Sequence, residues 1–209
     1  MNYIKYPRTF HLPWSEGVTS DDKVLKSVDL FKNKRVIVTE KMDGENTTMY
    51  QNYIHARSID SRHHDSRNWV KAFHSQICHN IPENWRVCGE NLYAKHSIKY
   101  YNLESYFYAF SIWDANNKCL SWDDFIIWCN LIELTPVNVL YDGIFDENKL
   151  QSLYSTEDLT SHEGYVVRIA DAFHFNDFKK SVAKFVRKNH VQTESHWMTQ
   201  EIIPNELQK

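Results

Sequence analysis

The stretch of sequence from Val36 to Tyr50 restricts the fold of this chain more than any other. It opens with a β-branched run, which is typical of a buried strand. One lysine, Lys41, stands directly before a turn marked by Asp43-Gly44, and a second run rich in threonine follows that turn. We therefore expect the second run to return as a strand beside the first. Lys41 would then lie at a strand end and point into the cleft that the hairpin borders.

A lysine in such a position can act as a nucleophile. Its amine becomes reactive when desolvation or nearby cations lower its pKa. The pattern Lys-x-Asp-Gly also suits an ordinary hairpin with a solvated lysine, and a match of only four residues is common. The interpretation therefore depends on whether other motifs follow in order downstream.

The composition is that of a folded protein with no overall positive charge. The 209 residues fit one domain, 1–209, and suffice to bury a sizeable core. With 42% hydrophobic and 24% charged residues, the chain is typical of soluble globular proteins. Its formal net charge is -3. Any surface that binds a polyanion must therefore be a local patch.

Cysteine usage and the N-terminal residues indicate an intracellular protein. The four cysteines form no CxxC pair, which suits reduced thiols better than a disulfide framework. The first eight residues contain no apolar signal-peptide region, and no run is long and apolar enough to span a membrane. We expect a cytoplasmic monomer that does not associate with membranes.

Periodicity and turn signals predict a mixture of strands and helices. Beyond the Lys41 region, strands are expected at 53–58, 85–89, 106–114, 137–141, 164–168 and 181–191. Helices are expected at 21–31, 66–81, 121–131 and 146–153. Ser66, Ser121 and Asp146 are the expected N-caps of the last three helices. Asp142-Gly143 is expected to turn the chain.

One pair of residues invites a zinc interpretation. His74 and Cys78 lie one helical turn apart, a spacing that metal sites use. A zinc site needs a second pair of ligands, and no compact partner pair follows. We therefore interpret both as ordinary residues of the helix.

The residues around Lys41 resemble a known family. Lys41-Met42-Asp43-Gly44 resembles the nucleotidyl-lysine motif of the ligase and capping-enzyme superfamily. The longer pattern Glu40-Lys41-x-x-Gly44-x-Asn46 is similar to that of the nick-sealing phage and cellular RNA ligases. This resemblance implies that Lys41 bonds covalently to AMP, with Glu40 and Asn46 in the nucleotide site. It also implies the family fold, an α+β nucleotidyltransferase domain of two antiparallel sheets with flanking helices.

Further motif residues follow in the order that the superfamily shows, and the resemblance implies a role for each. Arg57, in Arg-Ser, would contact the ribose or a phosphate, and Glu90, in Gly-Glu, would contact the ribose. Phe110, in Phe-Tyr-x-Phe-x-Ile, would stack on the purine. Glu163, in Glu-Gly-Tyr-Val-Val-Arg, would organise a divalent metal near the phosphates. Lys184 would grip the α-phosphate.

The last motif departs from the family pattern. A second lysine usually follows Lys184 at the next position but one, where this chain has Val186. Arg187 or Lys188 could supply the missing charge. Strand alternation places Lys188 on the same side as Lys184 if the strand is unbroken, which favours Lys188. Arg187 would turn inward only at a bulge or a strand end near Val186.

Two other features differ from the relatives. Ser111 stands where relatives often carry aspartate. The residues after the last motif, 192–209, suit a short helical tail and are too few for the additional domain that most relatives have.

Together these residues predict an ATP-dependent RNA ligase that uses Mg²⁺ or Mn²⁺, with an RNA-repair role. Neutral Lys41 would attack the α-phosphorus of ATP, its pKa lowered by the nearby cations. AMP would pass to a 5′-phosphate end, and a 3′-hydroxyl would displace it to seal ends or nicks in RNA or in RNA/DNA hybrids. A minimal DNA ligase, a GTP-using capping enzyme and a non-catalytic nucleic-acid-binding module are the alternatives.

Overall fold

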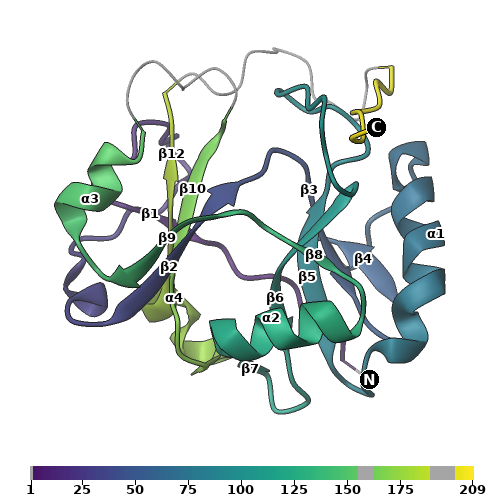
Figure 1. Ribbon diagram of the computed structural model, residues 1–209, viewed down its shortest axis with the longest axis horizontal. Helices are drawn as coiled ribbons and strands as arrows, with labels where there is room; N and C mark the ends of the chain where they lie inside the picture. The colour runs from purple at the N-terminus through teal and green to yellow at the C-terminus, as the bar shows by residue number, and fades with distance from the viewer. Residues whose placement is uncertain (1, 155–161, 189–200) are drawn as a thin grey trace.

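Two β-sheets form the framework of the protein, whose computed structural model describes residues 2–154, 162–188 and 201–209 (Figure 1). The first sheet has the strand order β1-β12-β10-β2-β9. Its strands are β1 (Phe10–His11), β2 (Arg35–Lys41), β9 (Val139–Ile144), β10 (Gly164–Ile169) and β12 (Val182–Val186). All neighbours in this sheet are antiparallel except β1, which pairs with β12 in parallel.

The second sheet has the order β11-β7-β6-β5-β3-β4, and β8 also pairs with β6. Its strands are β3 (Glu45–Met49), β4 (Ile54–Ala56), β5 (Arg86–Asn91), β6 (Phe107–Trp113), β7 (Lys118–Cys119), β8 (Thr135–Pro136) and β11 (Phe173–His174). All its pairs are antiparallel except that of β6 with β8. The predicted α+β class with two mainly antiparallel sheets is confirmed.

The chain does not form a hairpin at Asp43-Gly44. β2 pairs with β9 and β10 in the first sheet, whereas β3 pairs with β4 and β5 in the second. The Asp43 carboxylate accepts hydrogen bonds from the backbone N–H groups of Ser97 and Ile98, at 2.7 and 2.8 Å. These bonds hold the connection against a loop that leaves the second sheet. The expected pairing is wrong, and Lys41 lies where the chain passes from one sheet to the other.

Helices flank both sheets (Figure 1). The α-helices are α1 (Asn68–Ile77), α2 (Trp122–Leu131), α3 (Glu147–Ser152) and α4 (Phe178–Ser181). Short 3₁₀ turns span Asp29–Phe31, Asp65–Arg67, Cys78–Asn80 and Phe175–Asp177. α1 covers the outer side of the second sheet, and α3 lies beside the first. In the described ranges, no helix has both the length and the apolar character needed to cross a membrane.

Three of the four predicted helices are confirmed, as α1, α2 and α3. Ser121 and Asp146 are the N-caps of α2 and α3 as expected, because each side chain accepts a hydrogen bond of 3.1 Å from the backbone N–H three residues later. Ser66 is not a cap, since α1 begins after Arg67 without a side-chain cap. His74 of α1 makes a hydrogen bond of 2.6 Å with the carbonyl of Tyr50.

Two local predictions are wrong. Within 21–31 the only helical structure is the short 3₁₀ turn at Asp29–Phe31. The N–H of Leu25 bonds to the carbonyl of His11 at 2.8 Å, so this segment pairs with β1 instead of coiling. Asp142-Gly143 lies inside β9 and not in a turn. Arg35 holds the Asp142 carboxylate there, with Nε 2.8 Å from Oδ1.

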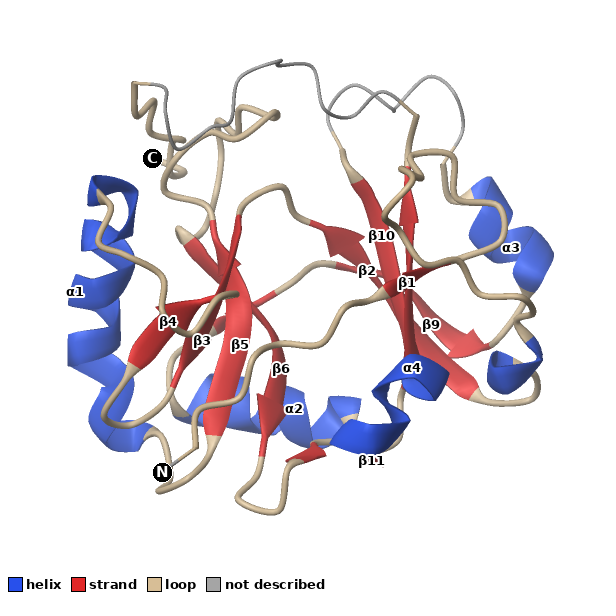
Figure 2. Ribbon diagram, turned by 180° about the vertical axis from the view of Figure 1, so that it is seen from behind, coloured by secondary structure: helices blue, strands red, loops and turns tan. Residues whose placement is uncertain are grey.

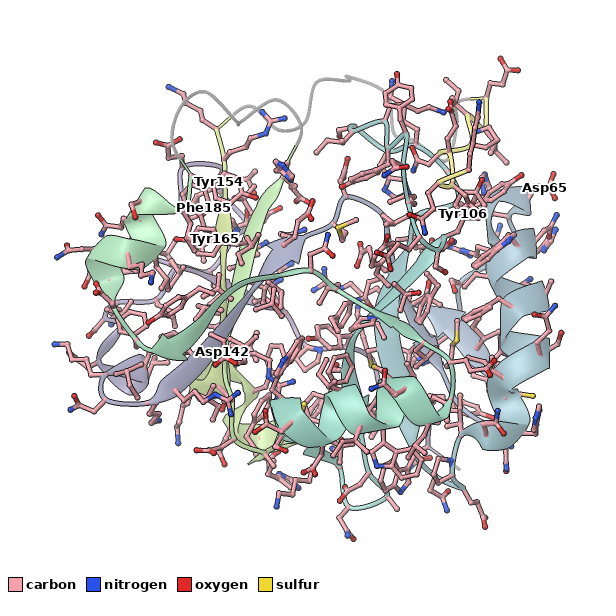
Figure 3. The ribbon with its side chains drawn as sticks, in the orientation of Figure 1. Asp65, Tyr106, Asp142, Tyr154, Tyr165 and Phe185 are labelled. Carbon is pink, nitrogen blue, oxygen red and sulfur yellow. The ribbon has the colours of Figure 1, made fainter. Side chains whose placement is uncertain are left out.

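An aromatic cluster fixes which side of the first sheet faces the second. Tyr154, Tyr165 and Phe185 pack together beside α3, with 4.9 Å between the ring centroids of Tyr165 and Phe185 (Figure 3). Side chains alternate along a strand. Val166 follows Tyr165, and Lys184 precedes Phe185. The side chains of Val166 and Lys184 therefore point to the opposite side of the first sheet, which faces the second sheet.

The segment 2–11, called the N-terminal strap below, runs from the second sheet to the first (Figure 2). At its start, the ring of Tyr3 stacks on Tyr53 with 4.1 Å between centroids. The N–H of Ile4 donates to the hydroxyl of Tyr50 at 2.9 Å. At its end, the strap becomes β1 and pairs with β12. Both ends of the strap are therefore fixed to the sheets.

The described part of the tail, 201–209, is not helical. Pro204 forms an extended bridge with Ala94. Asn205 donates from Nδ2 to the carbonyl of Leu92 at 2.7 Å and accepts the N–H of Tyr100 at 2.9 Å. The rest of the expected helical tail, 192–200, lies outside the described residues.

Candidate active site

A pocket of about 620 Å³ lies between the two sheets. Side chains of β2, β10 and β12 line it on one side, and side chains of β3, β5 and β6 line it on the other. Its volume suits a small-molecule ligand. Seven residues predicted from the sequence line it: Glu40, Lys41, Asn46, Arg57, Glu90, Phe110 and Lys184. The fold thus brings motifs from most of the chain to one place.

Lys41 and Glu163 form an ion pair at this pocket. The distance from Lys41 Nζ to Glu163 Oε2 is 2.6 Å, and both side chains are largely buried. They meet because Lys41 ends β2 and is paired with Gly164, the first residue of the neighbouring strand β10. Gly164 has a φ of 156°, and a Cβ there would overlap the carbonyl of Phe185. Glycine is therefore required directly after Glu163.

The charge state of Lys41 differs from the expectation. Burial acts to lower the pKa of its amine, and the carboxylates of Glu163, Glu90 and Asp43 act to raise it. The net effect leaves the pKa above its ordinary value. Lys41 is therefore a protonated amine held by Glu163, and a nucleophilic amine requires that this pair be broken.

Glu90 faces Lys41 from β5, where the register with β6 shifts between Cys88 and Gly89. Burial raises the pKa of the Glu90 carboxyl to about 8; Glu163 and Asp43 add to this, and Lys41 opposes it. At neutral pH the group is therefore mainly protonated. A protonated carboxyl can donate a hydrogen bond as well as accept one.

The apolar part of the pocket contains Phe110. Phe110, from β6, and Val166, from β10, come from the two facing sheets. The ring of Tyr6 from the strap meets Phe110 edge-on, with 5.1 Å between centroids. Apolar and aromatic walls of this kind suit a flat heterocycle. Ser111 next to it accepts the indole N–H of Trp113 at 3.0 Å.

Asn46 presents a polar atom to the pocket. Its Oδ1 is buried and has no hydrogen-bond partner among the residues that the structure describes. Buried polar atoms are nearly always paired in folded proteins. An unpaired acceptor that lines a pocket therefore fits a site that a ligand donor completes.

Glu40 is held from two sides. Its carboxylate lies 2.8 Å from His162 Nδ1 and accepts a hydrogen bond of 3.1 Å from the side chain of Asn138. Both partners belong to segments next to Glu163 and β9. These contacts of Glu40, the residue before Lys41, tie the end of β2 to the segments that lead into β9 and β10.

Lys184 projects from β12 into the same pocket. Its Nζ lies 3.8 Å from Asp22 Oδ1. Burial and the charge of Lys41, with a smaller effect of Arg57, lower the pKa of Lys184, while Asp22 and Glu163 oppose them. Burial acts to raise the pKa of Asp22, but hydrogen bonds from Thr19 and the charge of Lys184 bring it to about 2. Asp22 is therefore an anion beside Lys184.

The structure does not bring Lys188 or Arg187 into the pocket. β12 ends at Val186, and Lys188 lies exposed in the turn that follows. The expectation of an unbroken strand to Lys188 is therefore wrong. Arg187 is buried at the strand end, where its Nε donates to the carbonyl of His162 at 2.6 Å. Arg57, exposed at the rim of the pocket, supplies the additional cation near Lys184.

The sequence motifs missed the contribution of the N-terminal segment. Tyr6, Pro7, Arg8, Thr9 and Asp22 all line the pocket. The available signal was Pro7, which favours an extended backbone in the residue before it but indicates no partner. Contacts between distant parts of the chain bring this segment to the site: β1 pairs with β12, and Tyr3 and Ile4 contact the second sheet.

The acidic groups beside Lys41 suit a divalent cation that also binds phosphate. Glu163 offers carboxylate oxygens, the kind of ligand that Mg²⁺ and Mn²⁺ accept. Among the described residues, no group of three or more His, Cys, Asp or Glu side chains is placed to hold a metal by itself. Mg²⁺ commonly binds through one or two carboxylates together with substrate phosphates. The residues present fit that mode of binding.

Comparisons with known proteins concern the sequence and the fold of this chain. The sequence pattern of the family described as RNA ligase matches residues 34–186. A Naegleria gruberi RNA ligase lysine mutant with ATP and Mn has a TM-score of 0.56 at 18% identity, covering 90% of this chain and 59% of that chain. The same ligase with PPi gives 0.55 at 20% identity, covering 88% and 57%. This chain thus spans less than two thirds of those ligases. No curated protein matches the sequence.

Proposed function

The chain belongs to the RNA ligase family, and from that premise we propose that it is an ATP-dependent RNA ligase that works through lysyl-AMP. The observation that carries the proposal is the position of Lys41. It is a largely buried amine at a strand end, in a pocket that also presents Phe110, Asn46, Glu90 and Lys184. That set offers a surface for a base, polar groups for a ribose and a cation for a phosphate.

In the first step, Nζ of Lys41 attacks the α-phosphorus of ATP. A phosphorus–nitrogen bond forms, the bond to the bridging oxygen breaks, pyrophosphate leaves, and the amine gives up a proton. Deprotonation requires that the contact between Lys41 and Glu163 be released. The positive charge of Lys184 then acts to lower the pKa of Lys41 and to offset charge on the α-phosphate.

Glu163 has a second task in this proposal. Freed from Lys41, its carboxylate would hold the divalent cation, with phosphate oxygens completing the coordination. When bound, such a cation supplies Lewis-acid stabilisation of the phosphate charge. Glu163 is placed for both tasks because it begins β10 next to the end of β2.

In the second step, an oxygen of an RNA 5′-phosphate attacks the phosphorus of AMP and displaces Lys41. The product carries a 5′–5′ pyrophosphate linkage. In the third step, a 3′-hydroxyl attacks the 5′-phosphorus, forms the phosphodiester, loses its proton and expels AMP. Glu90, mainly protonated at neutral pH, is placed to donate to a ribose oxygen of AMP.

The proposal also covers the setting of the enzyme. We place it as a single nucleotidyltransferase unit that acts as a monomer in the cytoplasm and repairs RNA. Support comes from the four cysteines, Cys78, Cys88, Cys119 and Cys129, all of which are free thiols. Free thiols suit a reducing compartment.

A sealing assay tests the function. Three nicked duplexes should be compared: one of RNA, one of RNA on a DNA template, and one of DNA only. We expect sealing with ATP and Mg²⁺ or Mn²⁺ where RNA carries the nick, and no product with the Lys41→Ala variant. Sealing of the DNA nick alone, or of RNA by Lys41→Ala, would contradict the proposal.

A further inference from the structure

A second, basic groove adjoins the nucleotide pocket. Its volume is about 480 Å³, and six residues line it: Lys5, Tyr6, Pro7, Arg8, Arg57 and Ser58. Three of these are cations, and none is a carboxylate. A chain with a net charge of -3 has thus placed three positive side chains around one hollow, as a local polyanion site requires.

The groove, called the strap groove below, is continuous with the nucleotide pocket. Tyr6, Pro7, Arg8, Arg57 and Ser58 line both of them. Lys5 lines the strap groove but is not among the residues that line the nucleotide pocket. A path of positive charge therefore leads outward from the site of Lys41, past Arg57 and Arg8, to Lys5.

Contacts of the strap hold Arg8 and Tyr6 in place. Arg8 Nη1 donates to the carbonyl of Asp21 at 2.5 Å. Tyr6, between Lys5 and Arg8, packs edge-on against Phe178 at 5.4 Å between centroids, in addition to its contact with Phe110. Both ends of the strap are also anchored to the sheets. The backbone that carries Lys5 and Arg8 is therefore preformed, which lowers the cost of ordering on binding.

The acidic groups nearby leave the groove positive. Asp60 is exposed, and its carboxylate accepts a hydrogen bond of 2.8 Å from the hydroxyl of Ser58. That bond is the main cause of its lowered pKa, and the charge of Lys5 makes a smaller contribution. Asp22 faces Lys184 and Thr19 in the inner pocket. Neither carboxylate lines the groove.

We propose that the strap groove binds backbone phosphates of the RNA strand whose 5′-phosphate accepts AMP. The inference rests on the proposed function and names where that strand lies. ATP phosphates offer the same chemistry, but they end near Lys184 and Glu163, whereas Lys5 lies outside the nucleotide pocket. A polynucleotide that enters along the strap reaches all three cations and brings its 5′-phosphate to AMP on Lys41.

The test separates ATP binding from RNA binding. Lys5→Ala and the double variant Lys5→Ala/Arg8→Ala are compared with the wild type and with Lys34→Ala. Lys34 is an exposed lysine just before β2, at the end of that strand remote from Lys41. Self-adenylylation with ATP is measured first. AMP transfer from pre-adenylylated enzyme to a nicked RNA duplex is then measured at several salt concentrations.

Each lost phosphate contact should lower the slope of log affinity against log salt by about 0.7 to 0.9. For the double variant, the loss of affinity between about 50 and 200 mM salt should then be ~10-fold smaller than for the wild type. AMP transfer at limiting RNA should slow in both variants. Self-adenylylation and melting temperature should stay at the wild-type level in Lys5→Ala, because Lys5 lines the strap groove but not the nucleotide pocket. Lys34→Ala should match the wild type throughout.

Two results would overturn the proposal. Equal loss of self-adenylylation and AMP transfer in Lys5→Ala would assign the groove to ATP phosphates. Unchanged AMP transfer with an unchanged salt slope would show that no nucleic acid lies there. A wild-type protein that takes up no AMP would contradict the proposed function instead. Direct binding of the nicked RNA duplex by anisotropy, compared between the wild type and the double variant, would still decide on the groove.

Discussion

Replacing Glu90 with glutamine should change how the stability of this protein depends on pH. The Glu90 carboxyl has a pKa raised by burial from 4.5 to about 8 in the folded protein. An unfolded chain has no such environment, so the carboxyl there titrates near 4.5. Between these two values the folded protein keeps a proton that the unfolded chain has released.

The sign and size of the effect follow from proton linkage. The unfolded state binds fewer protons in this window, so the free energy of unfolding falls as the pH rises through it. One proton corresponds to a slope of at most about 1.4 kcal/mol per pH unit. Over the interval between the two pKa values of Glu90, the ceiling is about 5 kcal/mol. Glutamine has no proton to lose, and the variant lacks this term.

Urea denaturation at several pH values from 5 to 9 measures the difference. We expect Glu90→Gln to match the wild type near pH 5 and to be the more stable protein by several kcal/mol near pH 9. Glu83→Gln, which changes an exposed glutamate, should run parallel to the wild type at every pH. A constant difference between Glu90→Gln and the wild type across the range would refute a raised pKa at Glu90.

Two further predictions concern residues of the pocket. Lys184→Ala should slow single-turnover adenylylation by about tenfold or more, which is a loss of at least ~1.4 kcal/mol of transition-state stabilisation. Lys188→Ala should keep the wild-type rate because Lys188 lies outside the pocket. An equal loss in both variants would place Lys188 at the phosphate site after all. Phe110→Leu should weaken ATP binding by about 0.5–1.5 kcal/mol while Phe110→Tyr largely keeps it, as calorimetric titration would show; equal losses would mean that Phe110 only packs the core.

Local sequence signals placed the motif residues because each motif lies on a strand or directly beside one. β-branched and aromatic runs with turn residues after them identify such strands without reference to their partners. That sufficed for β2, β5, β6, β10 and the first residues of β12. Glycine was also informative, because the close approach of β10 to β12 leaves no room for a side chain at position 164 and so requires Gly164 there.

Pairing between distant strands could not be read from the chain. The turn residues Asp43-Gly44 suit a hairpin, but side-chain bonding of Asp43 to the loop at Ser97 and Ile98 sends the chain to the other sheet. The strap was missed for the same reason, because its role depends on β12, far away in sequence.

The spacing of the motifs also could not predict the charge state of Lys41. The cations expected to lower its pKa are present in part, but Glu163 lies closer, at 2.6 Å, and has the opposite effect. Lys41 is therefore a protonated amine in this arrangement.

Intact-mass spectrometry after incubation with ATP and Mg²⁺ tests the central claim most directly. The wild-type protein should gain the mass of one AMP, peptide mapping should locate it on Lys41, and the adduct should be labile to acid, as a phosphoramidate is. Lys41→Ala should gain nothing, whereas Lys34→Ala should behave as the wild type. An adduct on Lys41→Ala, or a wild-type adduct on any other residue, would contradict the account.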